Sequence, residues 1–176
     1  MKKSSRSILI TLSTLAIIIV IIIIIYNSSN NDKQLNVDNK PQNDVNNISC
    51  DSSLWEHVYH NYRLKVFEKC KSVTGYVELL RKEADGDYHI LLRVDEGQGK
   101  LLNNDNYAKQ KGCLVLEPIC VNEITQKDAI ADCSGYVNNV YIPQKHEHVK
   151  VTGSYVLDNE HGWMEIHPVS KIEVIP

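Results

Sequence analysis

Two short stretches of the sequence hold most of the side chains that can do chemistry. ADGDYH, residues 84–89, contains two aspartates and a histidine, and DNEHGW, residues 158–163, contains an aspartate, a glutamate, a histidine and a tryptophan. Carboxylates and imidazoles hydrogen-bond polar ligands, transfer protons and bind metal ions. The two stretches are about seventy residues apart, so they form one site only if the fold brings them together.

The second stretch leads directly into WMEIHPVSKIEVI, residues 163–175, whose pattern predicts a strand. Successive strand residues point to opposite faces, so Trp163, Glu165 and His167 share one face. Together with the first stretch and the strand that follows it, they define a candidate ligand-binding set: Asp87, Tyr88, His89, Arg93, His161, Trp163, Glu165 and His167.

Three interpretations of this set remain open. The first is a metal site: His89, His161 and His167 are suitable ligands for zinc or manganese, and an open coordination position would make a metal-dependent hydrolase. The spacing matches no known metal motif, since HGWMEIH is not HExxH. We therefore expect no cofactor, with a divalent metal as the alternative.

The second interpretation is a binding face without catalysis. Trp163, Tyr88 and Tyr155 can stack on ligand rings while the acids and histidines hydrogen-bond. The formal net charge is −3, and the face has more carboxylates than arginines or lysines, which argues against nucleic acid and favours a glycan, a peptide or a partner protein. The third is purely structural, because Asp-Gly and Gly162 are ordinary turn residues. We expect a binding module rather than an enzyme, with a structural envelope protein as a further alternative.

The elements that would position these residues are mainly strands. Hydrophobic alternation and turn residues predict five of them, with a helix at 125–136 between the third and fourth and a short helix at 52–62 in front. The strands are predicted at residues 72–82, 88–95, 112–120, 147–158 and 163–175.

This β-β-β-α-β-β order is that of the small five-stranded Greek-key barrel called the OB-fold, with an open sheet and helix as the alternative. In such a barrel the first and fourth strands are neighbours, and Gly75 and Gly153 would let them coil. The loops after the first and fourth strands lie beside one binding face. The two polar stretches are these two loops, so we expect them to meet.

Ahead of this domain, residues 8–26 contain no charged residue. As a helix they would span roughly 28 Å, close to the thickness of a bilayer's hydrocarbon core. Lys2, Lys3 and Arg6 precede the segment, which predicts a single-pass anchor with its N-terminus in the cytoplasm and the C-terminal domain outside. The predicted parts are a cytoplasmic tip (1–7), a transmembrane helix (8–26), a polar tether (27–50) and the extracellular domain (51–176). Secretion after signal cleavage is the alternative.

The five cysteines show no CxxC spacing, and an external location favours disulfides. We predict a bond between Cys120 and Cys133, which bracket a short loop, and as a second choice one between Cys50 and Cys70. Cys113 is then the remaining thiol, and we expect it to be buried.

DGDYHI, LVLEPIC, TQKDA and above all VTGSYVLDNEHGWMEIHPV resemble an uncharacterised family of small secreted or membrane-anchored microbial proteins. The resemblance covers residues 55–172. It implies an OB-type barrel in a secreted setting and contributes no activity.

Overall fold

The computed structural model describes residues 49–176, which form one compact unit. The predicted tip, transmembrane helix and all but the end of the tether lie outside the described residues. Within 49–176, no helix is long and apolar enough to cross a bilayer. The elements are the 3₁₀ helices η1 (Ser52–His57), η2 (Asn61–Arg63) and η3 (Gly99–Leu101), helix α2 (Asn104–Lys109), and the strands β1 (Leu64–Lys82), β2 (Tyr88–Val94), β3 (Leu114–Leu116), β4 (His148–Asp158) and β5 (Met164–Val174).

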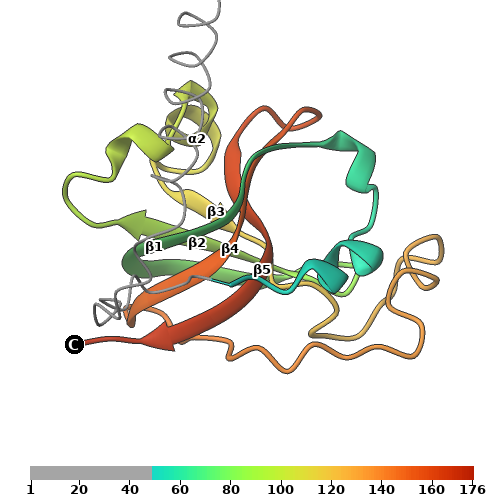
Figure 1. Ribbon diagram of the computed structural model, residues 1–176. Coiled ribbons are helices and arrows are strands. Elements are labelled where there is room, and N and C mark those ends of the chain that lie inside the picture. The colour runs from blue at the N-terminus through green and yellow to red at the C-terminus, as the bar shows by residue number, and fades with distance from the viewer. Residues whose placement is uncertain (1–48) are drawn as a thin grey trace, which may run out of the picture. The chain divides into compact units, whose positions relative to one another are not determined.

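The five strands form a closed ring of hydrogen-bonded neighbours in the order β1-β2-β3-β5-β4, with β4 pairing back to β1 (Figure 1). All pairs are antiparallel except β3 with β5. Closure satisfies the strand edges that an open sheet would leave unpaired. The prediction of a mainly β domain with the first and fourth strands as neighbours is confirmed.

Strand β1 is the longest element within residues 49–176, with 19 residues, and it pairs with β2 and β4. At its start Leu64 lies opposite Asp158 of β4. At its end Lys82 lies opposite Tyr88 of β2. Sequence reasoning found only the part from residue 72, because residues 65–69 are exposed and show no alternation of apolar and polar positions.

Two glycines allow the strands to approach closely. A Cβ atom on Gly153 would lie 2.4 Å from the backbone oxygen of Pro168, and one on Gly75 would lie 2.4 Å from the backbone oxygen of Arg93. Both contacts are with backbone of the neighbouring strand, which cannot move aside without breaking the pairing. We predicted that these glycines let the strands coil, and the structure shows that both lie where two strand backbones approach closely.

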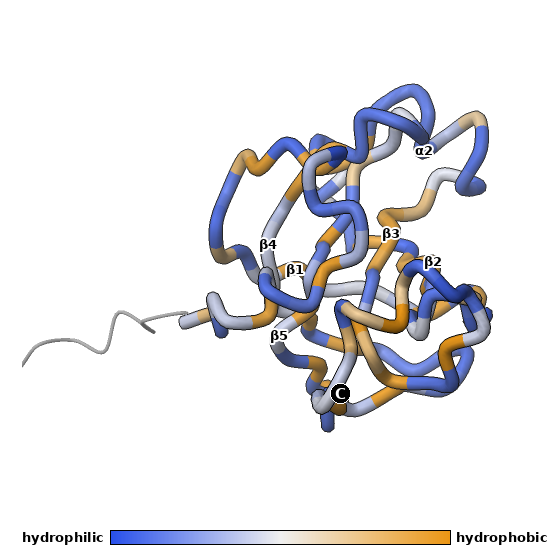
Figure 2. Tube along the Cα trace, turned by 90° about the vertical axis from the view of Figure 1, so that its right-hand side faces the viewer, coloured by the Kyte–Doolittle hydropathy of each residue, from blue (hydrophilic) through white to orange (hydrophobic). Residues whose placement is uncertain are grey.

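The barrel interior holds the main apolar core, and the rest of the apolar burial lies outside it. Ile90 and Leu92 of β2, Leu114 of β3 and Ile166 of β5 are fully buried in this core. A second cluster joins Leu54 of η1 to both cysteines of the Cys120–Cys133 disulfide. Figure 2 shows hydrophobic colour along β3 and hydrophilic colour in the loop around α2.

The helical predictions were less accurate. Residues 125–136 form successive turns and no regular helix, and the predicted helix at 52–62 is two short 3₁₀ helices with Asp51 rather than Ser53 as the cap of the first. Helix α2, between β2 and β3, was missed although Asn103 and Asn106 form a capping box at its start. All of these helices are short, and short helices depend on tertiary packing more than on propensity.

The cysteine predictions are confirmed. Disulfides join Cys50 with Cys70 and Cys120 with Cys133, with Cα atoms 5.5 and 5.6 Å apart. Cys113 is the free cysteine of the described residues and is buried. The first disulfide fastens the start of the domain to β1, and the second closes the turn region that follows β3.

Gly153→Ala should destabilise the domain by about 3 kcal/mol, because the added methyl group overlaps the backbone of β5. Urea unfolding followed by tryptophan fluorescence measures this change. Gly99→Ala is the matched control: its Cβ would meet only Tyr107 Oη at 3.9 Å, so stability should change by less than about 0.5 kcal/mol. Equal stability of the two variants would contradict the close approach.

Candidate functional site

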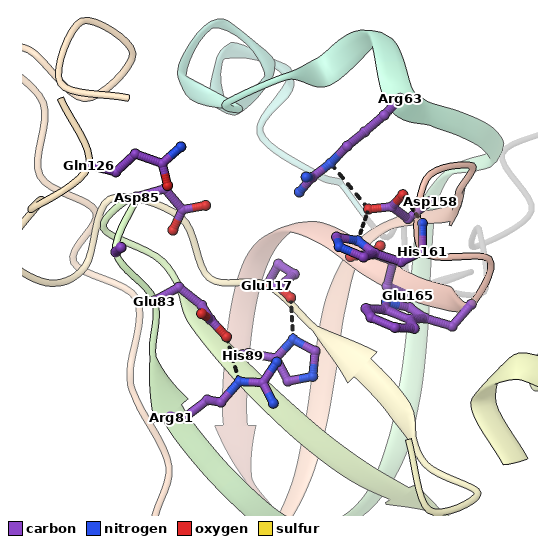
Figure 3. Close-up of a pocket in the computed structure, with 12 residues that line it drawn as sticks. Arg63, Arg81, Glu83, Asp85, His89, Glu117, Gln126, Asp158, His161 and Glu165 are labelled. Atoms are coloured by element: carbon purple, nitrogen blue, oxygen red, sulfur yellow. Dashed lines mark hydrogen bonds and ion pairs between the residues drawn. The ribbon is translucent and has the colours of Figure 1, made fainter. Parts of the chain in front are cut away.

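A pocket of about 190 Å³, partly open to solvent, lies where the β1–β2 loop, the end of β3 and the β4–β5 loop meet (Figure 3). Its wall includes His89 from the start of β2 and His161 from the β4–β5 loop. The structure therefore brings together the two polar stretches that are far apart in the sequence. Arg63, which precedes β1, and Arg81, near the end of β1, also line the pocket, and sequence reasoning missed both.

His89 is buried and fixed at both ring nitrogens. Its Nδ1 lies 2.8 Å from Glu117 Oε1, and its Nε2 lies 3.1 Å from Gln110 Oε1. Burial lowers the pKa of His89, against a smaller opposing effect of the Gln110 hydrogen bond, so the ring is held neutral. A neutral imidazole has only one N–H, which Nδ1 donates to the carboxylate or Nε2 donates to the amide oxygen.

Glu117 is the most important residue that sequence reasoning overlooked. Its side chain is 12% exposed, and burial together with the nearby charge of Glu165 raises its pKa well above that of an ordinary glutamate. The signal was present in the sequence, since Glu117 directly follows the apolar run LVL. A carboxyl group at the end of a buried strand is unusual without a partner or a function.

Glu165 and His167 of β5 form a second pair, with Oε2 and Nδ1 3.2 Å apart and both side chains 2% exposed. Burial disfavours the imidazolium, but the hydrogen bond and the charge of Glu165, helped by the neighbouring acids, raise the pKa of His167. Glu165 Oε1 and His167 Nε2 are buried without a hydrogen-bond partner among the described residues. Glu165 lines the pocket, whereas the predicted site residue His167 is not part of the pocket wall.

Asp158 organises the other side of the pocket and is 1% exposed. Its Oδ1 accepts hydrogen bonds from the backbone N–H groups of Glu160 and His161, and its Oδ2 lies 2.8 Å from His161 Nδ1 and 3.1 Å from Arg63 Nε. Burial alone would raise the pKa of Asp158, but the His161 hydrogen bonds and the Arg63 charge lower it overall. The ring of His161 also stacks on Trp163, with centroids 4.5 Å apart.

Asp87, another predicted site residue, lies outside the pocket wall. Its Oδ1 accepts a hydrogen bond from the backbone N–H of Cys120, and its backbone oxygen accepts one from Asn122. Burial, with a smaller contribution from the Asp85 charge, raises the pKa of Asp87 to about 7. The carboxyl group therefore supports the turn after β3, and Asp85 is the aspartate of this loop that lines the pocket.

Two further predicted residues do not join the pocket. Tyr88 packs against the barrel core. Arg93 lies four residues beyond His89 on β2, about 13 Å along a strand, and pairs there with Glu78. Both residues belong to β2, as His89 does, but neither is part of the pocket wall.

The predicted metal ligands do not form a compact set. In residues 49–176, the one group of three with metal-ligating atoms close together is Asp87, Cys120 and Cys133. Both of those sulfur atoms are in a disulfide, which removes the thiolates that a metal would bind. His89 and His167 are each paired with a glutamate, and His161 is paired with an aspartate.

The pocket thus combines two kinds of buried group. The pKa shifts favour the neutral forms of Glu117 and His89, whereas they favour the charged forms of His167 and Asp158. Such a site offers hydrogen-bond donors and acceptors as well as groups that exchange protons. Acids whose environments push their pKa values apart are a recurrent feature of functional sites.

Comparisons of the chain with family models, with curated proteins and with solved structures found no match. The resemblance stated from the sequence motifs therefore stays a prediction, and the pocket is interpreted from its own geometry.

Asp87→Asn should remove a pH dependence of stability. The pKa of Asp87 is raised in the folded state, so its protonated form stabilises the fold, and this contribution is lost as pH rises from about 4 to about 7. The amide stays neutral, so above pH 7 the variant should be more stable than the unchanged chain, by up to about 4 kcal/mol. Urea unfolding at pH 5 and pH 8 measures the difference.

Asp95→Asn is the control, because the pKa of Asp95 is shifted in the opposite direction from that of Asp87. Hydrogen bonds from Thr74 and His148 lower the pKa of Asp95, so its charged form stabilises the fold. This variant should gain no stability at pH 8. If Asp87→Asn behaves in the same way, burial of Asp87 does not govern its ionisation.

Proposed function

We propose that the domain is an extracytoplasmic binding module that takes a small polar ligand in the pocket between the β1–β2 and β4–β5 loops. The observation that carries the proposal is that Oε1 of Glu165, a residue of the pocket wall, is buried without a hydrogen-bond partner among residues 49–176, as is Nε2 of His167, with which Glu165 is paired. A buried polar atom without a partner costs roughly 1–3 kcal/mol, so a fold that keeps two of them together is adapted to something other than stability.

The strand order supports an OB-like barrel as the scaffold. The ring β1-β2-β3-β5-β4 has the connectivity of that barrel, and its usual ligand face lies between the loops that line this pocket. The region between β3 and β4 departs from the usual plan, because turns and a disulfide replace the helix.

The ligand class follows from the side chains of the wall. Arg63 and Arg81 donate hydrogen bonds, whereas Asp85 and Glu165 accept them, so a ligand with several hydroxyl, amide or charged groups is favoured. A short glycan or a peptide has this chemistry. Both arginines are already paired with acids, Asp158 and Glu83, so the wall lacks the positive groove that nucleic acid requires.

The location is also part of the proposal. Two disulfides favour an oxidising compartment, and the uncharged segment 8–26 favours a membrane anchor. The metal-dependent hydrolase expected as an alternative lacks an assembled ligand set among the described residues. A purely structural envelope protein would have no ligand, which the experiment below tests.

Ligand binding should change the fluorescence of Trp163. The chain has two tryptophans, and Trp55 donates its N–H to Ser154 away from the pocket, so Trp55→Phe leaves Trp163 as the only reporter. Titration with panels of neutral oligosaccharides and di- and tripeptides should give a saturable change for one class. A ligand at 100 times its Kd should also stabilise the fold by about 2.7 kcal/mol, seen as a higher melting temperature.

Arg81→Ala in the same background should weaken this binding about tenfold or more. Arg93→Ala is the matched control, because Arg93 has the same exposed pairing with a glutamate but lies outside the pocket wall. Equal losses in the two variants, or no response to any member of either panel, would contradict the proposed site.

The orientation can be tested separately with intact cells that express the full chain. Added proteinase K should digest the C-terminal domain while an epitope tag placed before Met1 stays protected. Recovery of the domain from the medium would support the cleaved signal peptide, and protection of the whole chain would contradict an external location.

A further inference from the structure

The pocket holds an oriented histidine whose arrangement goes beyond what binding requires. Asp158 fixes His161 through Nδ1, and stacking on Trp163 sets the plane of the ring. Since the carboxylate accepts the Nδ1 proton, the neutral ring has its lone pair on Nε2. This is the relation between a general base and its positioning residue in many hydrolytic sites.

The same oxygen of Asp158 also holds a cation. Oδ2 contacts both His161 Nδ1 and Arg63 Nε, so the imidazole and the guanidinium lie side by side (Figure 3). Arg63 Nε forms an ion pair with Asp158 but is buried without a hydrogen-bond partner among residues 49–176. The two terminal nitrogens of its guanidinium group can bind an anionic oxygen in pairs. Arg81 uses Nε for Glu83 in the same way and lines the same pocket.

Glu117 supplies the complementary group. It lines the pocket with His161, and burial beside Glu165 raises its pKa, which favours the protonated form. His89 Nδ1 contacts Glu117 Oε1 at 2.8 Å, which leaves Oε2 to carry the transferable proton. Asp85, Asp87 and His167 are the other charged groups that act on Glu117, and Asp158 and Arg63 face His161. A neutral carboxyl group can give a proton to a leaving oxygen.

We propose that this pocket hydrolyses a phosphodiester, an inference that rests on the proposed function. His161 acts as general base and Glu117 as general acid. Arg63 and Arg81 bind the two non-bridging oxygens. Two guanidinium groups suit a phosphodiester because its charge is spread over two such oxygens. The carboxylates around the arginines disfavour a long polyanion, so the substrate is small or a chain end.

In the proposed step, a water oxygen attacks phosphorus as His161 Nε2 takes one proton from the water. The new P–O bond forms while the bond to the leaving oxygen breaks, and the leaving alkoxide takes the proton of Glu117. The products are a phosphomonoester and an alcohol. His161 then releases its proton to solvent and Glu117 takes one up, so the site returns to its starting state and one water is consumed.

The test uses the full chain in detergent micelles with bis(p-nitrophenyl) phosphate as the probe and EDTA present. The unchanged chain should release p-nitrophenolate at a rate proportional to protein concentration. His161→Ala and Glu117→Gln should each lower kcat/KM by about 10²–10⁴-fold. His148→Ala is the matched control, because His148 forms the same kind of pair with Asp95 at 2.9 Å outside the pocket wall, and its activity should not change.

The pH profile separates chemistry from structure. kcat/KM should fall at high pH as Glu117 loses its proton, and Glu117→Gln should remove that fall. Thymidine 5′-(p-nitrophenyl phosphate) and p-nitrophenyl phosphorylcholine then compare a nucleotide source with a lipid-headgroup source. The class with the higher kcat/KM is assigned as the substrate.

Three results would overturn the proposal: no release by the unchanged chain, equal release by His161→Ala, or release only after a metal is added to EDTA-free protein. Melting temperatures of the variants show whether each has folded. If the Trp163 reporter responds to the probe without turnover, binding stands and hydrolysis fails. If it responds to no ligand at all, the proposed function fails as well.

Discussion

The pocket depends on the coiling of β1. A straight strand of 19 residues would be about 60 Å long, yet Arg63, just before β1, and Arg81, near its end, line the same pocket. The strand bends at register shifts after Val66, Glu68 and Val77 and where Gly75 contacts the neighbouring backbone. Bulges and close glycine contacts are how sheets curve enough to close. Without this coiling, the β4–β5 loop and the β1–β2 loop would not face each other.

The second constraint is electrostatic. Several acids and imidazoles share a small space with little water, and such a cluster is tolerated only if some members give up their charge and others are paired. Glu117 and His89 are held neutral, and Glu165 with His167 and Asp158 with Arg63 form the pairs. This division leaves the site with neutral and charged hydrogen-bonding groups side by side, which is the basis of the binding and acid–base roles that we propose.

Much of the domain was predictable from the sequence. Apolar patterning bounded by turn residues located all five strands, and β2, β4 and β5 each contain a long run of buried residues. Cysteine spacing gave both disulfides. Alternation also placed Trp163 and Glu165 on one side of β5, and both line the pocket. The helices were the weakest part, because 3₁₀ turns of three to six residues have no period long enough to detect.

The candidate site, too, was predictable only in part. The sequence by itself determined which residue types were present, that DNEHGW and ADGDYH are loops, and that His89, His161, Trp163 and Glu165 belong to the segments that form the site. Only the tertiary structure decided that Glu117, Arg63 and Arg81 join them, that Arg93 and Asp87 do not, and which groups carry charge. The reason is that local patterns depend on neighbours along the chain. Strand curvature, shared partners such as Asp158 Oδ2, and the pKa shifts of buried groups depend on contacts between segments far apart in sequence.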